Sequence, residues 1–214
     1  SLRDLRLPLG QLNVVTGANG TGKSSLYRAL RLLADCASGR VISSLAREGG
    51  LDSVLWAGPE HVAATVRSGR YPVQGTARSA PISLQLGFAS EDFSYLIDLG
   101  LPTRYESSAF NLDPEIKREV VWSGPVMRPA TVLVKRKSAL VELRGTSSRR
   151  DSWENFENAL RPYESVLTEV LDPVRAPELV AVREQIRSWR FYDQFRTDVD
   201  SPVRQSQIGT RTPV

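Results

Sequence analysis

Residues 16–25 read TGANGTGKSS and place three glycines, one lysine and four hydroxyl side chains between an apolar segment and a helical one. Glycines let the backbone curl without side chains in the way, so that successive N–H groups point into one concavity. A helix beginning at Gly22 adds its unpaired N–H groups and the positive end of its dipole. This stretch therefore predicts a cradle for phosphate-like anions.

Gly17 to Ser24 fits the pattern G-x-x-x-x-G-K-[ST], the phosphate-binding P-loop. Lys23 is expected over the β- and γ-phosphates of ATP, as the one catalytic residue predicted here, and the Ser24 hydroxyl is expected to coordinate Mg²⁺. The alternative is a chance match, but the loop follows an apolar run and opens an amphipathic helix, the context the motif requires. The predicted nucleotide contacts are Gly17, Ala18, Asn19, Gly20, Thr21, Gly22, Lys23, Ser24 and Ser25.

The residues on either side of this loop predict strands before it and helices after it. Residues 5–17 indicate two short strands with a turn at Pro8–Gly10, the second strand being Leu12 to Val15. Leu26, Leu30 and Leu33 recur at helical spacing within a helix that ends near Ser38-Gly39. A shorter helix is expected at residues 41–48, closed by Gly49-Gly50.

Beyond residue 60 the hydrophobic period changes from 3.6 to 2, which indicates strands. Alternating segments follow one another without helices between them, which predicts an antiparallel meander with one buried face. The segments are residues 81–88, 93–100, 115–122, 130–137 and 139–145.

Helical spacing returns in the last third of the chain. Three helices are expected there, the first capped by Asp151 or Ser152 and ended by Pro162, followed by a strand and a polar loop. These helices cover residues 151–160, 165–171 and 177–189, and the strand covers 189–195. The expected domains are a P-loop core at 1–60, an antiparallel β subdomain at 61–150, and a helical segment with strand and tail at 151–214.

Composition limits the class of protein. The chain has 214 residues, 41% of them hydrophobic, and a net charge of +4 with a pI near 9.4, which permits but does not require a nucleic-acid partner. No apolar run approaches the roughly 20 residues of a membrane span, and there is no signal-peptide pattern. A single cysteine, Cys36, excludes an intrachain disulfide. The expected location is the cytoplasm, and the start at Ser1 suggests a fragment.

The sequence around the loop, LRDLRLPLGQLNVVTGANGTGKSSLYRALRLL, resembles the opening of the ABC-type ATPase heads of RecF, SMC and Rad50 proteins. It is most similar to predicted AAA-family ATPases of the RecF-like and OLD-like groups, and VREQIRSWRFYDQF…SPVR is similar to the stretch before their second half. This resemblance implies an α/β P-loop NTPase fold, a head lobe with an antiparallel β subdomain and following helices. It also implies ATP and Mg²⁺ as cofactors, a second head as homodimer partner, and DNA as a possible target.

The chain departs from that family in the parts that hydrolyse ATP. A signature loop, an apolar strand ending in Asp-Glu and a switch histidine are missing. Asp98 lacks the apolar lead and the following Glu, and His61, the one histidine, precedes the β region and is expected to be structural or at the surface. We therefore expect the chain to stop before the catalytic half and to be inactive alone.

Other candidates are weaker. Gln194 is the best match by order to the glutamine that joins the lobes of such heads, with Gln205 and Gln207 as rivals, and Arg204 is a candidate phosphate contact. The basic triplet Lys135-Arg136-Lys137, with Arg149-Arg150 nearby, fits either nucleic-acid phosphates or a solvated turn at a hairpin tip. The four tryptophans fit the core better than base stacking; they are Trp56, Trp122, Trp153 and Trp189.

The favoured interpretation is the ATP-binding half of an ABC-type ATPase head in DNA repair, chromosome maintenance or phage defence. One alternative is a P-loop kinase or nucleotide-dependent transferase, which needs a parallel sheet with helices between its strands. The other is a nucleotide-binding interaction module that does not hydrolyse ATP.

Overall fold

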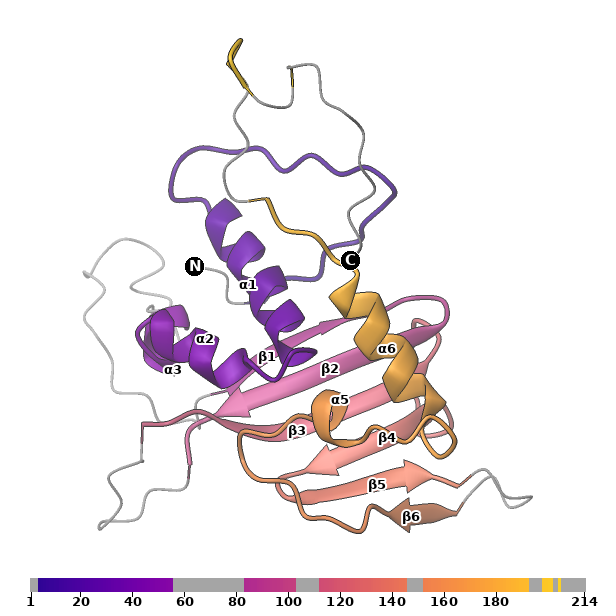
Figure 1. Ribbon diagram of the computed structural model, residues 1–214. Coiled ribbons are helices and arrows are strands. Elements are labelled where there is room, and N and C mark those ends of the chain that lie inside the picture. The colour runs from indigo at the N-terminus through magenta and orange to yellow at the C-terminus, as the bar shows by residue number, and fades with distance from the viewer. Residues whose placement is uncertain are drawn as a thin grey trace, which may run out of the picture.

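The computed structural model describes residues 4–55, 83–102, 112–145, 152–192, 198–201 and 204. Its centre is a six-stranded sheet in which each strand pairs with the next along the chain, so the order is β1-β2-β3-β4-β5-β6 (Figure 1). Every pairing is antiparallel, which confirms the meander predicted from the alternating segments. The strands are β1 Ser83–Phe88, β2 Phe93–Gly100, β3 Glu115–Ser123, β4 Val132–Lys137, β5 Leu140–Arg144 and β6 Trp153–Asn155.

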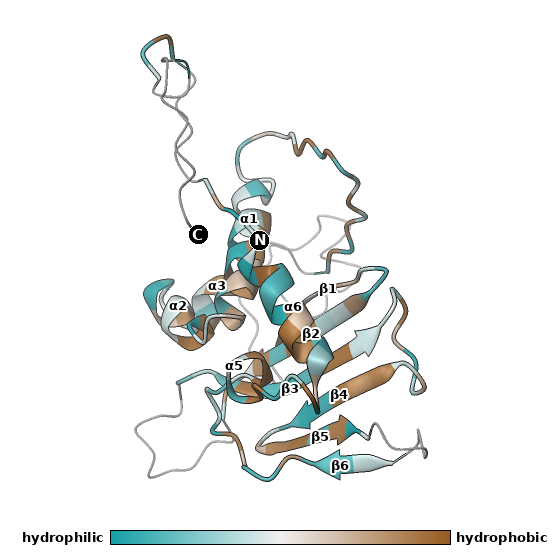
Figure 2. Cartoon of the chain, turned by 45° about the vertical axis from the view of Figure 1, so that its right-hand side comes forward, coloured by the Kyte–Doolittle hydropathy of each residue, from teal (hydrophilic) through white to brown (hydrophobic). Residues whose placement is uncertain are grey.

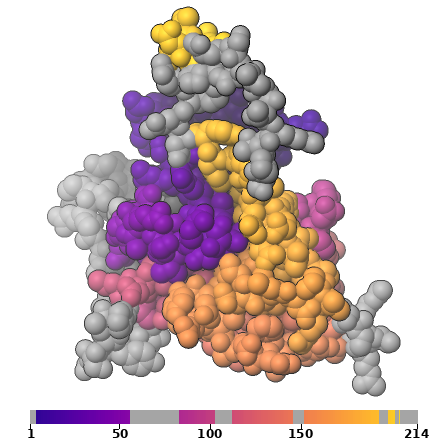
Figure 3. All heavy atoms as spheres, in the orientation of Figure 1, coloured from indigo at the N-terminus to yellow at the C-terminus, as the bar shows by residue number. Residues whose placement is uncertain are grey.

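The helices cover one face of this sheet (Figures 1 and 2). α1 and α6 lie side by side across it, and α6 turns its apolar residues Leu179, Val182 and Ile186 inward. The space-filling view shows the purple atoms of α1 and α2 beside the orange atoms of α6 (Figure 3). The helices are α1 Lys23–Cys36, α2 Val41–Arg47, α3 Leu51–Val54, α5 Val166–Glu169 and α6 Pro177–Arg187.

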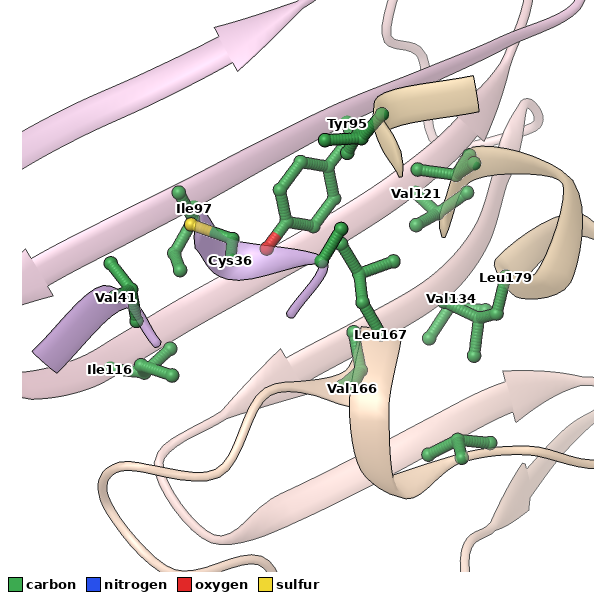
Figure 4. Close-up of a cluster of buried hydrophobic side chains, with 14 of the residues drawn as sticks. Cys36, Val41, Tyr95, Ile97, Ile116, Val121, Val134, Val166, Leu167 and Leu179 are labelled. Atoms are coloured by element: carbon green, nitrogen blue, oxygen red, sulfur yellow. The ribbon is translucent and has the colours of Figure 1, made fainter. Parts of the chain in front are cut away.

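One hydrophobic core joins helices and sheet. Cys36, at the end of α1, packs near Ile97 and Tyr95 of β2 (Figure 4). Leu167 of α5 and Val134 of β4 belong to the same cluster, and all five side chains are buried. The C-terminal half of α1 is therefore anchored in the core, while its N-terminal end projects away from the sheet (Figure 1).

The expected strand at Leu12–Val15 does not form, and that prediction was wrong for this structure. Residues 4–16 contain no strand, and the side chains of Leu12 and Val14 are 87% and 79% exposed. A strand needs a neighbour for its backbone N–H and C=O groups, and the six strands of the sheet lie elsewhere. The strand expected over 189–195 is also missing in its described part, residues 189–192, and residues 193–195 lie outside the described residues.

The helix expected at residues 151–160 does not form in its described part, residues 152–160, where Trp153–Asn155 is strand β6 instead. Trp153 to Asn155 pair with β5, and the backbone N–H of Phe156 donates to the Val141 carbonyl at 2.8 Å. Farther on, the Leu160 N–H donates to the Ala139 carbonyl at 2.9 Å. The spacing of Trp153, Phe156 and Leu160 is typical of a helix. The backbone N–H and C=O groups at the free edge of β5 form hydrogen bonds with this segment instead. Tertiary pairing thus decided the structure of an ambiguous segment.

Candidate nucleotide-binding site

The P-loop lies at the exposed end of α1 and has the backbone shape that its glycines allow. Gly20 and Gly22 have φ angles of +83° and +102°, in the left-handed region that other residues avoid. At Gly17 an added Cβ would lie 2.9 Å from the Thr21 hydroxyl oxygen, so a side chain there would collide with the loop itself. Thr21 in turn donates from its hydroxyl to the Ala18 carbonyl at 2.9 Å.

Lys23 is held inside this loop. Its ammonium Nζ donates to the carbonyl oxygens of Gly17 and Ala18, at 2.5 and 2.7 Å. The cation therefore lies next to the backbone that the motif assigns to the phosphates, before any ligand is considered. To meet an anion, the ammonium would exchange these carbonyl contacts for the oxygens of the anion.

The first turn of α1 is open to an anion. Gly22 occupies the N-cap position without a side chain that could cap the helix, and the first turn contains no acidic residue. Unpaired N–H groups and the positive end of the dipole of this 14-residue helix therefore face the loop. Ser24 is exposed and Ser25 is half-buried, so the Ser24 hydroxyl is accessible to a metal ion.

The acidic residues of the described part of the chain are the candidate partners for the loop. Within the described residues no three His, Cys, Asp or Glu side chains cluster as a metal site. Asp98, the acid weighed from sequence, accepts hydrogen bonds from Ser83 and Gln85 on the sheet, at 2.6 and 3.1 Å. One hydroxyl and one ammonium can hold a triphosphate and part of a Mg²⁺ shell, but hydrolysis also needs a group that positions water.

Few of the other sequence candidates lie within the described residues. Arg204 is exposed and bonded through its backbone to Ser201 at 2.9 Å. The remaining candidates lie outside the described residues, namely Gln194, Gln205, Gln207, His61, Trp56, Arg149 and Arg150. Trp122 is buried and Trp189 packs edge-on against Phe88 at 5.5 Å, as predicted for both. Trp153 is half-buried beneath the Lys135 ammonium and lies outside the core cluster, so the prediction of a core residue was wrong there.

The basic triplet needs a correction, because its middle member is in the core. The hairpin tip is Ser138-Ala139, and Arg136 is a buried residue of β4 rather than a solvated or DNA-facing one. Its guanidinium lies 2.8 Å from the Glu119 carboxylate, and both side chains are fully buried. Arg136 also donates to the carbonyls of Ser138, Arg161 and Glu164.

Glu119 is the centre of a polar network that sequence reasoning missed. Its carboxylate accepts from the Tyr95 hydroxyl at 2.7 Å, the Ser165 hydroxyl at 2.6 Å and the Val166 N–H at 3.1 Å. Ser165 caps α5 through Leu167. The network therefore fixes α5 to the sheet. A signal was present in the sequence, since Glu119 and Arg136 share strand parity with the buried Val121 and Val134.

Burial changes the acidity of two groups beside this network. Burial and the negative charges of Glu119 and Asp35 raise the pKa of the Cys36 thiol well above its ordinary value. Burial, and next the Glu119 charge, likewise raise the pKa of the Tyr95 hydroxyl. Both groups therefore stay protonated in the folded protein at neutral pH, and neither is a reactive anion.

Comparison with known proteins gives one family. The model of the family described as "AAA domain, putative AbiEii toxin, Type IV TA system" matches residues 12–202. No curated protein and no solved structure matches the chain. The match, together with the six-stranded antiparallel sheet and its helices, confirms the expected fold class, an α/β P-loop NTPase fold. Within the described residues, no helix has the length and apolar character to cross a membrane.

Proposed function

The chain belongs to this family of AAA domains, which are nucleotide-binding ATPase modules, and we propose that it is the ATP-binding part of an ABC-type ATPase head acting on DNA. RecF, SMC, Rad50 and OLD-like proteins are the groups whose heads it resembles. DNA repair, chromosome maintenance and phage defence are the processes in which such a head would serve. The observation that carries the proposal is the loop at the end of α1, where Lys23 lies against the Gly17 and Ala18 carbonyls.

In this proposal the backbone N–H groups of residues 17–25 cradle the phosphates. Lys23 would exchange its carbonyl contacts for the β- and γ-phosphates, and the Ser24 hydroxyl would ligate Mg²⁺. When bound, Mg²⁺ neutralises charge on the phosphates. The exposed Ser24 and the acid-free first turn suit this donor set, because neither repels the phosphates nor blocks the ion.

Hydrolysis would require a further part of the head, carrying a signature loop and a strand that ends in acidic residues. The segment before the loop supports this view. Residues 4–16 expose Leu12 and Val14 and form no strand, although a P-loop ordinarily follows a buried strand. Added strands from that further part would cover these side chains and bring the missing acids beside Ser24. A second head would then close the composite site.

The kinase or transferase alternative fits less well. It needs parallel strands connected by helices, whereas all five pairings in the sheet are antiparallel. The alternative of an interaction module that does not hydrolyse ATP differs from the proposal only in ATP turnover. A measurement of both ATP binding and ATP hydrolysis therefore separates the two.

The test measures binding and turnover together. The chain should bind ATP·Mg²⁺ and hydrolyse it no faster than Lys23→Ala. Addition of the C-terminal half of a related head should then produce hydrolysis that rises with protein concentration, because the composite site needs two heads. Binding without any activation by added halves would favour the interaction module. Single-turnover hydrolysis by the chain alone, abolished by Lys23→Ala, would contradict the proposed division of the site.

A further inference from the structure

The face of the sheet opposite the helices carries a row of basic side chains. Strand alternation places Tyr95, Ile97 and Val121 toward the helices and their neighbours on the opposite face. On that opposite face, register sets Arg118 of β3 directly across from Lys137 of β4, and Lys135 lies two residues before Lys137. None of the described helices covers this face (Figures 1 and 2).

Arg118 and Lys137 form an unfavourable pair in the protein alone. Like charges directly opposite each other in a sheet are destabilising. Both side chains are exposed, and no acid within the described residues forms an ion pair with either of them. Asp98 is the cross-strand neighbour of Arg118 on the other side, and its carboxylate, which accepts from Ser83 and Gln85 of β1, offsets part of this repulsion without forming an ion pair.

The neighbouring cation is held in place. The Lys135 ammonium lies 4.0 Å from the centre of the Trp153 ring and 3.1 Å from the Glu142 carboxylate. Arg144 lies over the same ring at 5.7 Å and donates to the carbonyls of the 129–132 turn. Lys135 is therefore oriented by its contacts, in contrast to a mobile surface lysine.

Protection of a sheet edge against pairing with another chain does not explain the position of these charges. Lysines often blunt the edge strands of sheets, but β4 is the fourth of six strands and is paired on both sides. An anion between Arg118 and Lys137 would turn their repulsion into a shared attraction. A chain of phosphates would also reach Lys135, which is about 7 Å along the strand from Lys137.

From this arrangement we infer that the helix-free face of the sheet binds the phosphate backbone of nucleic acid through Arg118, Lys137 and Lys135. The inference rests on the proposed function, because it names the surface by which the ATPase head would contact DNA. Binding at this surface does not require contacts with the bases, because the exposed cations interact with the phosphate charges, which are the same in every sequence.

The experiment follows the salt dependence of binding by fluorescence anisotropy, with the whole chain and labelled DNA of about 30 nucleotides, single-stranded and duplex. For Arg118→Gln/Lys137→Gln, the log–log slope should become shallower by about 0.9 per lost contact on duplex and about 0.7 on single strands. At about 0.15 M salt this amounts to about 30-fold weaker duplex binding. The probe that binds the wild-type chain more tightly at the same salt concentration identifies the preferred form of DNA.

Two further variants make the result specific. Arg187→Gln/Arg190→Gln removes the same charge from the end of α6 and should leave the slope unchanged. Glu142→Gln frees Lys135 from its carboxylate and should tighten binding and steepen the slope. Arg118→Gln/Lys137→Gln should unfold at the same temperature as wild type or slightly above it, because like-charge repulsion is lost.

An unchanged slope for Arg118→Gln/Lys137→Gln, or an equal loss in the α6 variant, would overturn the inference. ATP binding, measured in parallel, separates it from the proposed function. If the double variant keeps the wild-type slope while the chain still binds ATP, only the inferred DNA-binding surface is wrong. If this face binds DNA but the chain does not bind ATP, only the proposed ATPase function is wrong.

Discussion

The two ends of α1 differ in burial and in how their polar groups are hydrogen-bonded. At its C-terminal end Cys36 is fully buried in the core beside a network in which Glu119 and Arg136 satisfy each other. At its N-terminal end the loop is exposed and the helix N-cap has no side-chain bond. The first end has its polar partners within the core, whereas the second is a helix N-terminus without a side-chain cap, with Lys23 bonded to the carbonyls of the loop. The difference separates groups that support the fold from groups that we propose for a ligand.

The buried end should be the more sensitive to loss of one partner. Glu119→Ala leaves Arg136 charged and unpaired in the core, so it should lower the free energy of unfolding by about 3–5 kcal/mol. Urea denaturation measures this change. Glu142→Gln breaks the half-exposed pair with Lys135 and should cost about 0–1 kcal/mol. Equal losses in the two variants would show that burial of the ion pair does not matter.

The next largest effect depends on pH and on Cys36. The pKa of its thiol is raised in the folded state, so only the unfolded chain releases that proton just above about pH 8.5. The contribution is complete below the unfolded pKa, and stability should fall by about 1.4 kcal/mol per pH unit above it. Cys36→Ala should remove this slope between about pH 8.5 and 9.5. A slope that persists in Cys36→Ala would assign the pH dependence to other groups.

The loop itself should respond less in stability than the buried ion pair. Gly20 has φ +83° with open space around its Cβ position, so Gly20→Ala introduces only backbone strain, about 1–2 kcal/mol. Gly20→Asn should cost less, because asparagine tolerates the left-handed region better. Thermal unfolding of the two variants makes the comparison. A loss as large as that of Glu119→Ala would mean that the loop is part of the core.

The elements predicted best from the sequence are those whose own hydrophobic periodicity determines their secondary structure. The five alternating segments became strands, and the helix from Lys23 to Cys36 formed as expected, because these patterns carry their own periodicity. Leu12 to Val15 did not, since an apolar run becomes a strand only when another strand pairs with it. Residues 153–155 were predicted as helix because the spacing of apolar residues within this segment does not reveal its pairing with β5.

The shape of the loop was predictable for the same local reason, and the buried network was not. The P-loop is one short motif whose glycines determine their own geometry. Lys23, predicted to lie over the phosphates, contacts the Gly17 and Ala18 carbonyls, and its role toward a nucleotide stays a prediction. Glu119 and Arg136 are 17 residues apart and meet only through the register of β3 and β4. Charged residues are seldom fully buried, so sequence alone favoured a solvated Arg136.

The central claim is that the exposed end of α1 holds a nucleoside triphosphate. Titration of ATP with Mg²⁺ into the wild-type chain and Lys23→Ala, followed by calorimetry, tests it most directly. Loss of charge-assisted contacts worth about 1.5–3 kcal/mol should weaken binding by about 10- to 150-fold, while thermal unfolding without nucleotide stays within about 0.5 kcal/mol of wild type. Equal affinity of the two proteins for ATP, or no binding by the wild type, would contradict the account.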